Sequence, residues 1–329
     1  MKSTIILLLA AFTLGACGDD NPTVSGPAPH HSIIYTASDP LDGHVEIVRA
    51  SSDGTGRQML LEGSLIGGPV AGHMLYLTAD RTDIAVANTD GSGSRTVRSA
   101  GYPTQVQFAV LSPDGQRFAS VDWNSGRAEL VVQKLDGTGR EVIATGLWSD
   151  TKTGFSADGR KLAFFATDRS VHVIDIDGTN ERAVTAPMTG GMRNTDWISF
   201  QPAWSPSGEW LAVESLSDEE IDIVRADGGS PATLPSFRGS FPSWSPDGKE
   251  VACNDNEWIV VHPINGTSRG LVNDWSRSYR SGLPWSTDGR RLLSRYGNIQ
   301  FAGRLTSIDV ARKEVTFIDE SAFDAYWLP

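Results

Sequence analysis

The stretch Trp244-Ser245-Pro246-Asp247-Gly248 is a tight-turn sequence that recurs along the chain and decides its fold. The serines of its five clear copies are separated by 44, 49, 40 and 41 residues. A period of this size is typical of a repeat architecture. The other copies, some of them altered, are Leu111–Gly115, Phe155–Gly159, Trp204–Gly208, Trp285–Gly289 and a worn copy near Val70-Ala71-Gly72.

A second turn, built on Asp-Gly or Asn-Gly, alternates with the first. Proline presets the backbone of a type I turn, and glycine accepts the left-handed conformation that follows, so both sequences are hairpin signals. The runs between the turns are rich in Val, Ile and aromatic residues, which favour β-strands. The copies are Asp53-Gly54, Asp90-Gly91, Asp136-Gly137, Asp177-Gly178, Asp227-Gly228, Asn265-Gly266 and a worn seventh at Val310–Lys313.

These patterns predict an all-β fold, in which residues 32–329 form a β-propeller of four-stranded antiparallel blades. Seven copies of the second turn predict seven blades, whereas the alternative, a six-bladed ring, would leave one turn over. The first strand-like run, Ser32–Ala37, lacks an inner neighbour, and the last run, Phe323–Pro329, matches an inner strand. We expect the C-terminal strand to complete the first blade, close the ring and remove an exposed sheet edge.

One aromatic position recurs with the repeat, immediately before the turn serine. It holds Trp204, Trp244 and Trp285, and Phe155 matches them. We interpret these side chains as packing between adjacent blades rather than as stacking platforms for a ligand. Cys253 lies in a strand-like apolar run and is expected to be a small core residue.

The first 31 residues have the composition of an export signal and a tether. Residues 1–17 contain Lys2, a short apolar run and Leu14-Gly15-Ala16-Cys17, which resembles the lipobox of bacterial lipoproteins. That resemblance implies that Cys17 is acylated; the alternative is an ordinary cleaved signal with a chance cysteine. In the lipoproteins that this sequence resembles, the residue after the cysteine influences the membrane of destination. Gly18 at that position favours an outer-membrane location, with the protein facing the periplasm. Residues 18–31 are polar and rich in Pro and Gly, and are expected to be a disordered tether.

Net charge and residue types exclude several kinds of partner and chemistry. The formal net charge of −12 argues against nucleic acid and against docking on anionic lipid. Gly266–Gly270 matches the G-x-S-x-G pattern of hydrolases, but it falls in a hairpin turn rather than a strand-to-helix elbow. His44, His73, His172 and His262 fall in four different blades, so we expect no metal site, no cofactor and no catalytic residue.

The two turn motifs together resemble the TolB-like family of bacterial propeller repeats, which is related to WD-repeat domains. The resemblance covers nearly all of residues 32–329 and implies a periplasmic binding scaffold more often than a catalyst. The chain departs from TolB in its predicted seven blades where TolB has six, in its lipobox and in the lack of an N-terminal α/β domain.

Variable loops on the face opposite the short turns are the predicted binding surface, since binding residues concentrate on loops over a rigid scaffold. Two long loops between blades combine Trp and Arg, which are typical interface anchors. The alternative is that these loops only cover the ends of the central channel. The candidate partner-binding residues are Trp123, Trp148, Arg193, Asp196, Trp197, Trp275, Arg277, Tyr279 and Arg280.

We therefore predict a non-catalytic, lipid-anchored scaffold that binds an envelope protein or peptide and is held at the membrane through Cys17. The alternative is a propeller-fold enzyme, a polysaccharide lyase or a hydrolase, with its site in the axial channel.

Overall fold

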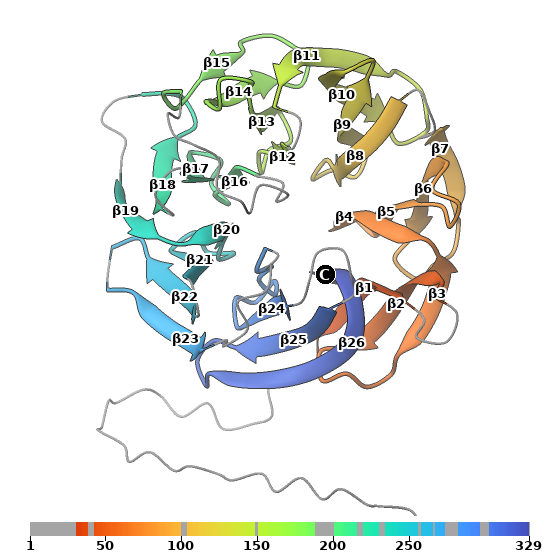
Figure 1. Ribbon diagram of the computed structural model, residues 1–329, viewed down its shortest axis with the longest axis vertical. Helices are drawn as coiled ribbons and strands as arrows, with labels where there is room; N and C mark the ends of the chain where they lie inside the picture. Colours follow the sequence, from red (N-terminus) through yellow and green to blue (C-terminus); the bar gives the residue numbers. More distant parts are fainter. Residues whose placement is uncertain are drawn as a thin grey trace, which may run out of the picture.

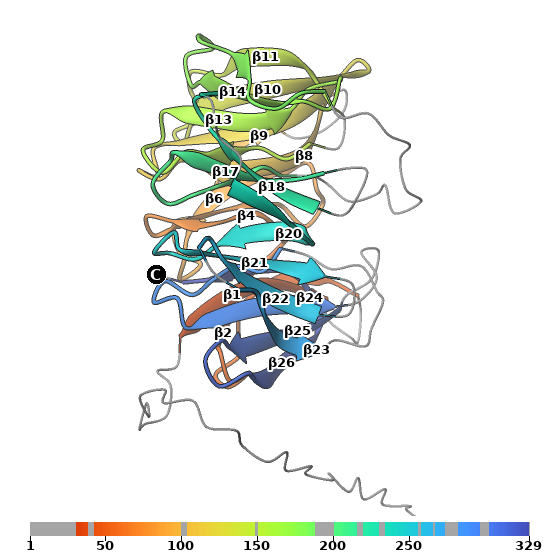
Figure 2. The same ribbon diagram turned by 90° about the vertical axis from the view of Figure 1, so that its left-hand side faces the viewer.

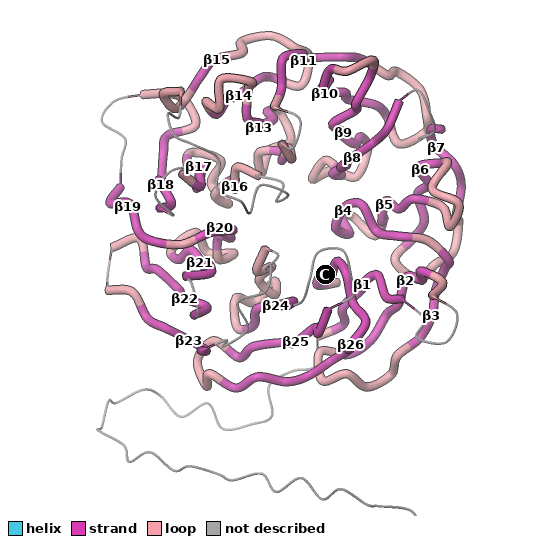
Figure 3. The backbone as a smooth tube through the Cα atoms, viewed as in Figure 1, coloured by secondary structure: helices cyan, strands magenta, loops and turns pink. Residues whose placement is uncertain are grey.

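The computed structural model describes residues 31–38, 43–99, 104–148, 151–187, 201–215, 220–229, 234–255, 258–265, 267–273, 282–296 and 303–328. These residues form a ring of antiparallel sheets around a central axis (Figures 1 and 3). Seen from the side, the ring is a single disc (Figure 2). No helix in the described ranges has the length and apolar character that a membrane span requires.

Five of the sheets are four-stranded, and in each the first strand lies nearest the axis (Figure 1). The first two comprise β4 (Ser64–Val70), β5 (His73–Leu77), β6 (Asp83–Asn88) and β7 (Arg95–Ser99), then β8 (Thr104–Leu111), β9 (Arg117–Asn124), β10 (Arg127–Lys134) and β11 (Glu141–Leu147). The next two comprise β12 (Gly154–Phe155), β13 (Lys161–Phe165), β14 (Val171–Asp175) and β15 (Arg182–Ala183), then β16 (Ala203–Trp204), β17 (Trp210–Glu214), β18 (Glu220–Arg225) and β19 (Leu234–Arg238). The fifth comprises β20 (Ser240–Trp244), β21 (Glu250–Asp255), β22 (Trp258–Pro263) and β23 (Arg269–Asn273).

The sixth sheet has six strands and joins the two ends of the chain. Its order is β24 (Arg291–Tyr296), β25 (Gly303–Asp309), β26 (Glu314–Trp327), β1 (Ser32–Ser38), β2 (Val45–Ser51) and β3 (Gln58–Glu62). β26 pairs with β1 in the register Ile33 to Trp327 and Ile34 to Tyr326. The prediction that the C-terminal strand completes the first blade is confirmed.

The predicted number of blades is wrong: the described residues form six sheets, not seven. The reason is β26, which runs for 14 residues and pairs with β25 along one part and with β1 along the other. The units that carry the first and the last Asp-Gly-type turns therefore share a strand and become one sheet. Trp285, expected in an inner strand of a separate blade, keeps only an isolated bridge to Leu292 of β24.

Four tryptophans of the repeat each donate to a backbone carbonyl of the repeat before them. The indole Nε1–H of Trp204 donates to the carbonyl oxygen of Gly154 at 2.9 Å, and that of Trp244 donates to Ala203 at 3.0 Å. Trp285 and Trp327 repeat the bond, to Ser243 at 3.0 Å and to Pro284 at 2.8 Å. Trp327, in the closing strand, therefore makes the same contact as the tryptophans inside the ring.

Most of the hydrophobic core lies between sheets rather than within them. One cluster joins Val121 and Leu130 of one sheet to Phe155 and Phe164 of the next, and the others follow the same plan around the ring. A further cluster lies inside the six-stranded sheet, between its β24–β25 part and its β1–β2 part. Each aromatic of the repeat position packs in such a cluster, which confirms the predicted packing role. Cys253 is fully buried, as expected, and burial raises the pKa of its thiol.

The serine of each inner turn holds the turn together from inside. Buried Ser245 donates its hydroxyl to Asp247 at 2.7 Å and accepts the backbone N–H of Glu250 at 3.0 Å. The Asp247 carboxylate also accepts the N–H of Lys249. These bonds satisfy polar groups that burial would otherwise leave unpaired. The same set recurs at Ser112, Ser156 and Ser286.

This chemistry predicts a loss of stability in acid. Hydrogen bonds from the turn serine and from the backbone lower the pKa of Asp114, Asp158 and Asp247. Because the folded-state pKa lies below the unfolded-state value of about 4, the stabilisation is complete above that value and is lost as the pH falls through the folded-state pKa. We expect the free energy of unfolding, measured by urea titration, to fall as the pH drops from about 5 to about 2. The combined variant Asp114→Asn, Asp158→Asn and Asp247→Asn keeps an acceptor oxygen and should give a flatter dependence; an unchanged slope would contradict this assignment.

Candidate functional site

A cavity of about 900 Å³ lies among the inner strands of the ring. Much of its wall is made by β4, β8, β12, β16, β20 and the C-terminal end of β26, which lie around the axis in Figure 1. The cavity is thus the axial channel of the propeller. Small-ligand sites in proteins are typically concave pockets lined mainly by apolar groups with a few polar ones.

Two positions of the repeat line the channel in different ways. Two residues before the turn serine lie Val110, Gly154, Ala203, Ser243 and Pro284, of which the last four supply the carbonyls that accept the tryptophan N–H. Four residues before the turn serine lie Phe108, Lys152, Gln201, Phe241 and Gly282. The second position recurs in each repeat, but the kind of side chain that it carries varies between repeats. Such variation is what a binding surface on a repeated scaffold requires.

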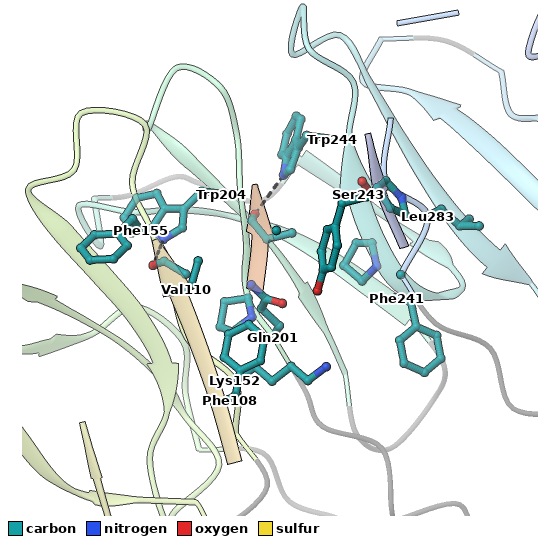
Figure 4. A pocket seen from close by; sticks show the side chains of 18 of the residues that line it. Phe108, Val110, Lys152, Phe155, Gln201, Trp204, Phe241, Ser243, Trp244 and Leu283 are labelled. Carbon is teal, nitrogen blue, oxygen red and sulfur yellow. Dashed lines mark hydrogen bonds between the residues drawn. The ribbon is translucent and has the colours of Figure 1, made fainter. Parts of the chain in front are cut away.

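One side of the channel carries a cation over an aromatic ring. The Lys152 ammonium lies 5.1 Å from the centroid of the Phe108 ring, which attracts it electrostatically. Gln201 is next to them and donates from Nε2 to the carbonyl of Thr153 at 3.2 Å. Figure 4 shows these three labelled side chains grouped on one side of the cavity.

Phe241, in β20, lines another part of the wall in a strained conformation. Its φ is +57°, a left-handed value that costs a bulky residue about 1–3 kcal/mol. The other described non-glycine residues with positive φ lie in turns and bends, whereas Phe241 lies within β20. The pairing of β20 with β21 shifts register between Ser240 and Ser243, so the strand bulges at this point. Bulges re-aim side chains and are common next to binding sites.

β24 and the closing strand β26 add polar groups to the wall. Arg295 is buried and donates from Nε to the carbonyl of Ala322 at 3.2 Å. Burial lowers the pKa of Arg295, and the Asp324 carboxylate opposes this effect. Burial, with a smaller contribution from Asp324, raises the pKa of Tyr326, so its hydroxyl stays neutral at ordinary pH.

Most of the sequence-predicted binding residues lie outside the described ranges. These are Arg193, Asp196, Trp197, Trp275, Arg277, Tyr279 and Arg280, together with the lipidation candidate Cys17. Trp148 is half-buried, in edge-to-face contact with Phe165 and with the Arg169 guanidinium over its ring. Trp123 is half-buried against a core cluster. Neither Trp123 nor Trp148 lines the axial cavity.

The histidines and the G-x-S-x-G pattern do not converge on a site. Ser268 is hydrogen-bonded to Nδ1 of His262 at 2.6 Å, and the His262 ring stacks on Phe237. The other ring nitrogen, Nε2, is buried and has no partner among the described residues, so no carboxylate orients this histidine as in a catalytic triad. No group of three or more His, Cys, Asp or Glu residues that could hold a metal ion occurs in the described part of the chain.

Sequence reasoning missed the channel residues Phe108, Lys152, Gln201 and Phe241. The signal that could have found them is their fixed place four residues before each turn serine, combined with their differing chemistry. The predicted loops were chosen for their length and composition instead.

No family model matches the chain. It is 27% identical over 222 residues to the protein TolB homolog of Chlorobium luteolum, a match that covers 60% of this chain and 50% of that protein. Shorter matches are to proteins named Tol-Pal system protein TolB, among them that of Hydrogenovibrio crunogenus. The chain thus spans about half the length of the Chlorobium relative and less of the others.

Solved propellers have the same fold. TolB from Acinetobacter baumannii superposes with a TM-score of 0.54 at 18% identity, over 91% of this chain and 67% of that one. An oligogalacturonate lyase in complex with manganese superposes with a TM-score of 0.64 at 14% identity, over 81% of this chain and 82% of that one. At these identities the comparisons show the fold alone. Together with the sequence matches, they confirm the resemblance to TolB-like propellers.

The strained backbone of Phe241 gives a prediction that depends on the conformation alone. At an ordinary strand position glycine is less stable than alanine by about 0.5–1 kcal/mol, but at positive φ the order reverses. We expect Phe241→Gly to be more stable than Phe241→Ala by about 1 kcal/mol in urea unfolding. Phe237 in β19 is the control position, where the alanine variant should be the more stable of the two. The same order at both positions would contradict the strained conformation.

Proposed function

We propose that this protein is an exported, lipid-anchored envelope scaffold that binds a segment of another envelope protein at its axial channel, without catalysing a reaction. The sequence similarity to TolB proteins, some of them named for the Tol-Pal system, supports an envelope role. In this proposal Cys17 carries the lipid anchor, residues 18–31 form the tether, and the ring faces the periplasm from the outer membrane. The loop residues Arg193, Trp197, Trp275 and Arg280 are proposed to extend the binding surface.

The observation that carries the proposal is the wall of the channel. Equivalent positions of the repeat hold Phe108, Lys152, Gln201 and Phe241 around a cavity of about 900 Å³, a size within the range of ligand pockets. Their aromatic, cationic and amide groups suit a polypeptide segment with mixed side chains. The indole-to-carbonyl bonds of the ring use the other lining position.

The alternative is a propeller-fold enzyme, a lyase or a hydrolase. Its support is the fold shared with oligogalacturonate lyase, whose sequence identity of 14% shows the fold alone. The scaffold is therefore the function that the channel wall supports best.

Site-directed photo-cross-linking in intact envelopes tests the proposal. A photoactivatable residue in place of Gln201, which is exposed within the cavity, should capture one specific envelope protein. The same residue in place of Met59, which is 47% exposed on an outer strand, is the control and should not capture that protein. Capture from both positions, or from neither, would contradict binding at the channel. Depolymerisation of acidic glycans by the purified chain would support the enzyme instead.

A further inference from the structure

The conformation of Phe241 is maintained by a carboxylate from the neighbouring sheet. Glu214, at the end of β17, accepts the backbone N–H of Phe241 at 3.0 Å. The following residue is Pro242, which by itself favours an extended, negative-φ backbone at Phe241, so the positive φ depends on contacts from elsewhere. Strained residues persist only where the surroundings fix them, and they concentrate at ligand clamps. The Glu214 contact therefore presets Phe241 before any ligand arrives.

The start of the same strand is fixed as well. Gly239 has a φ of +155°, and a Cβ at this position would lie 2.4 Å from the sulfur of buried Cys253. Only glycine fits so close to that side chain. This contact fixes the position at which β20 begins. The bulge that follows places Phe241 on the cavity wall (Figure 4).

Another part of the cavity wall presents a cation. Lys152 extends past the Phe108 ring, and among the described residues it forms no ion pair. The wall also holds two carboxylates: Glu214, which accepts the Phe241 N–H, and Asp324, whose charge raises the pKa of buried Arg295 against the effect of burial. In a chain of net charge −12, the channel thus offers a positive group beside an apolar ring.

We propose that the cavity binds an acidic peptide segment, whose apolar side chain packs on Phe241 while an adjacent carboxylate reaches Lys152. This inference rests on the proposed function and names the chemistry of its partner. Glu214 is a positioning residue in this site, since it acts through Phe241. A ready-made clamp avoids part of the ordering cost of binding.

A pair of end-blocked pentapeptides tests the inference, one with leucine between two aspartates and one with leucine between two asparagines. Binding to the full chain is measured by ligand-observed NMR at low salt, where charge attraction is least screened. We expect the aspartate peptide to bind roughly five- to ten-fold more tightly. Lys152→Gln should remove this preference and Lys152→Arg should keep it. Lys249→Gln, at a lysine that is 80% exposed on a turn, is the matched control and should change nothing.

The positioning role of Glu214 has its own readout. Glu214→Ala and Glu214→Gln remove the same charge, but only glutamine keeps an oxygen for the Phe241 N–H. We expect Glu214→Ala to weaken binding of both peptides and Glu214→Gln to restore it. Circular dichroism of each variant confirms that the ring is folded.

Several results would overturn the inference. These are equal binding of the two peptides, a preference that survives Lys152→Gln, or no binding of either peptide at millimolar concentration. If the Gln201 cross-link is still formed in that case, the channel binds a partner of different chemistry and the proposed function stands. If the Gln201 cross-link is absent as well, the proposed function fails independently.

Discussion

The bond from a tryptophan N–H of one repeat to a backbone carbonyl of the preceding repeat, made at four places in the described ring, is the constraint on which this structure depends. It holds neighbouring inner strands at a fixed separation and places their small residues on the channel wall. The apolar clusters between sheets form behind it. A sheet of this kind buries its hydrophobic face only against the next sheet, so the stability of each blade depends on the completeness of the ring.

Closure of the ring is therefore a property of the two chain ends together. Trp327 donates to Pro284 on one side, and its strand pairs with β1 on the other. Without β26 the inner edge of β1 would be an unpaired strand edge, the feature that natural sheets avoid. The same strand continues into pairing with β25, which joins the ends of the chain into one six-stranded sheet.

The elements that sequence analysis predicted correctly are those that depend on contacts between residues close together in the sequence. Ser245 and Asp247 define a turn through contacts within a few residues, so the hairpins and the propeller class follow from the sequence. The number of blades does not, because it depends on whether the chain breaks within β26, which is decided by pairing with strands nearly 300 residues away. The site was missed for another reason: Phe241 and Lys152 break no sequence pattern, and the contact that holds the Phe241 backbone comes from Glu214 in a different sheet.

Scaffold and site are thus divided between two positions of the repeat, two and four residues before the turn serine. The position two residues before the serine supplies the carbonyls that bind the tryptophans of the next repeat. The position four residues before it supplies Phe241, Lys152 and their equivalents to the channel wall. Hydrogen–deuterium exchange on the variant Trp327→Ala tests this account most directly. If ring closure sustains the whole fold, exchange should accelerate in every sheet, including β12–β15 far from the substitution. Acceleration confined to β1 and β24–β26 would contradict it.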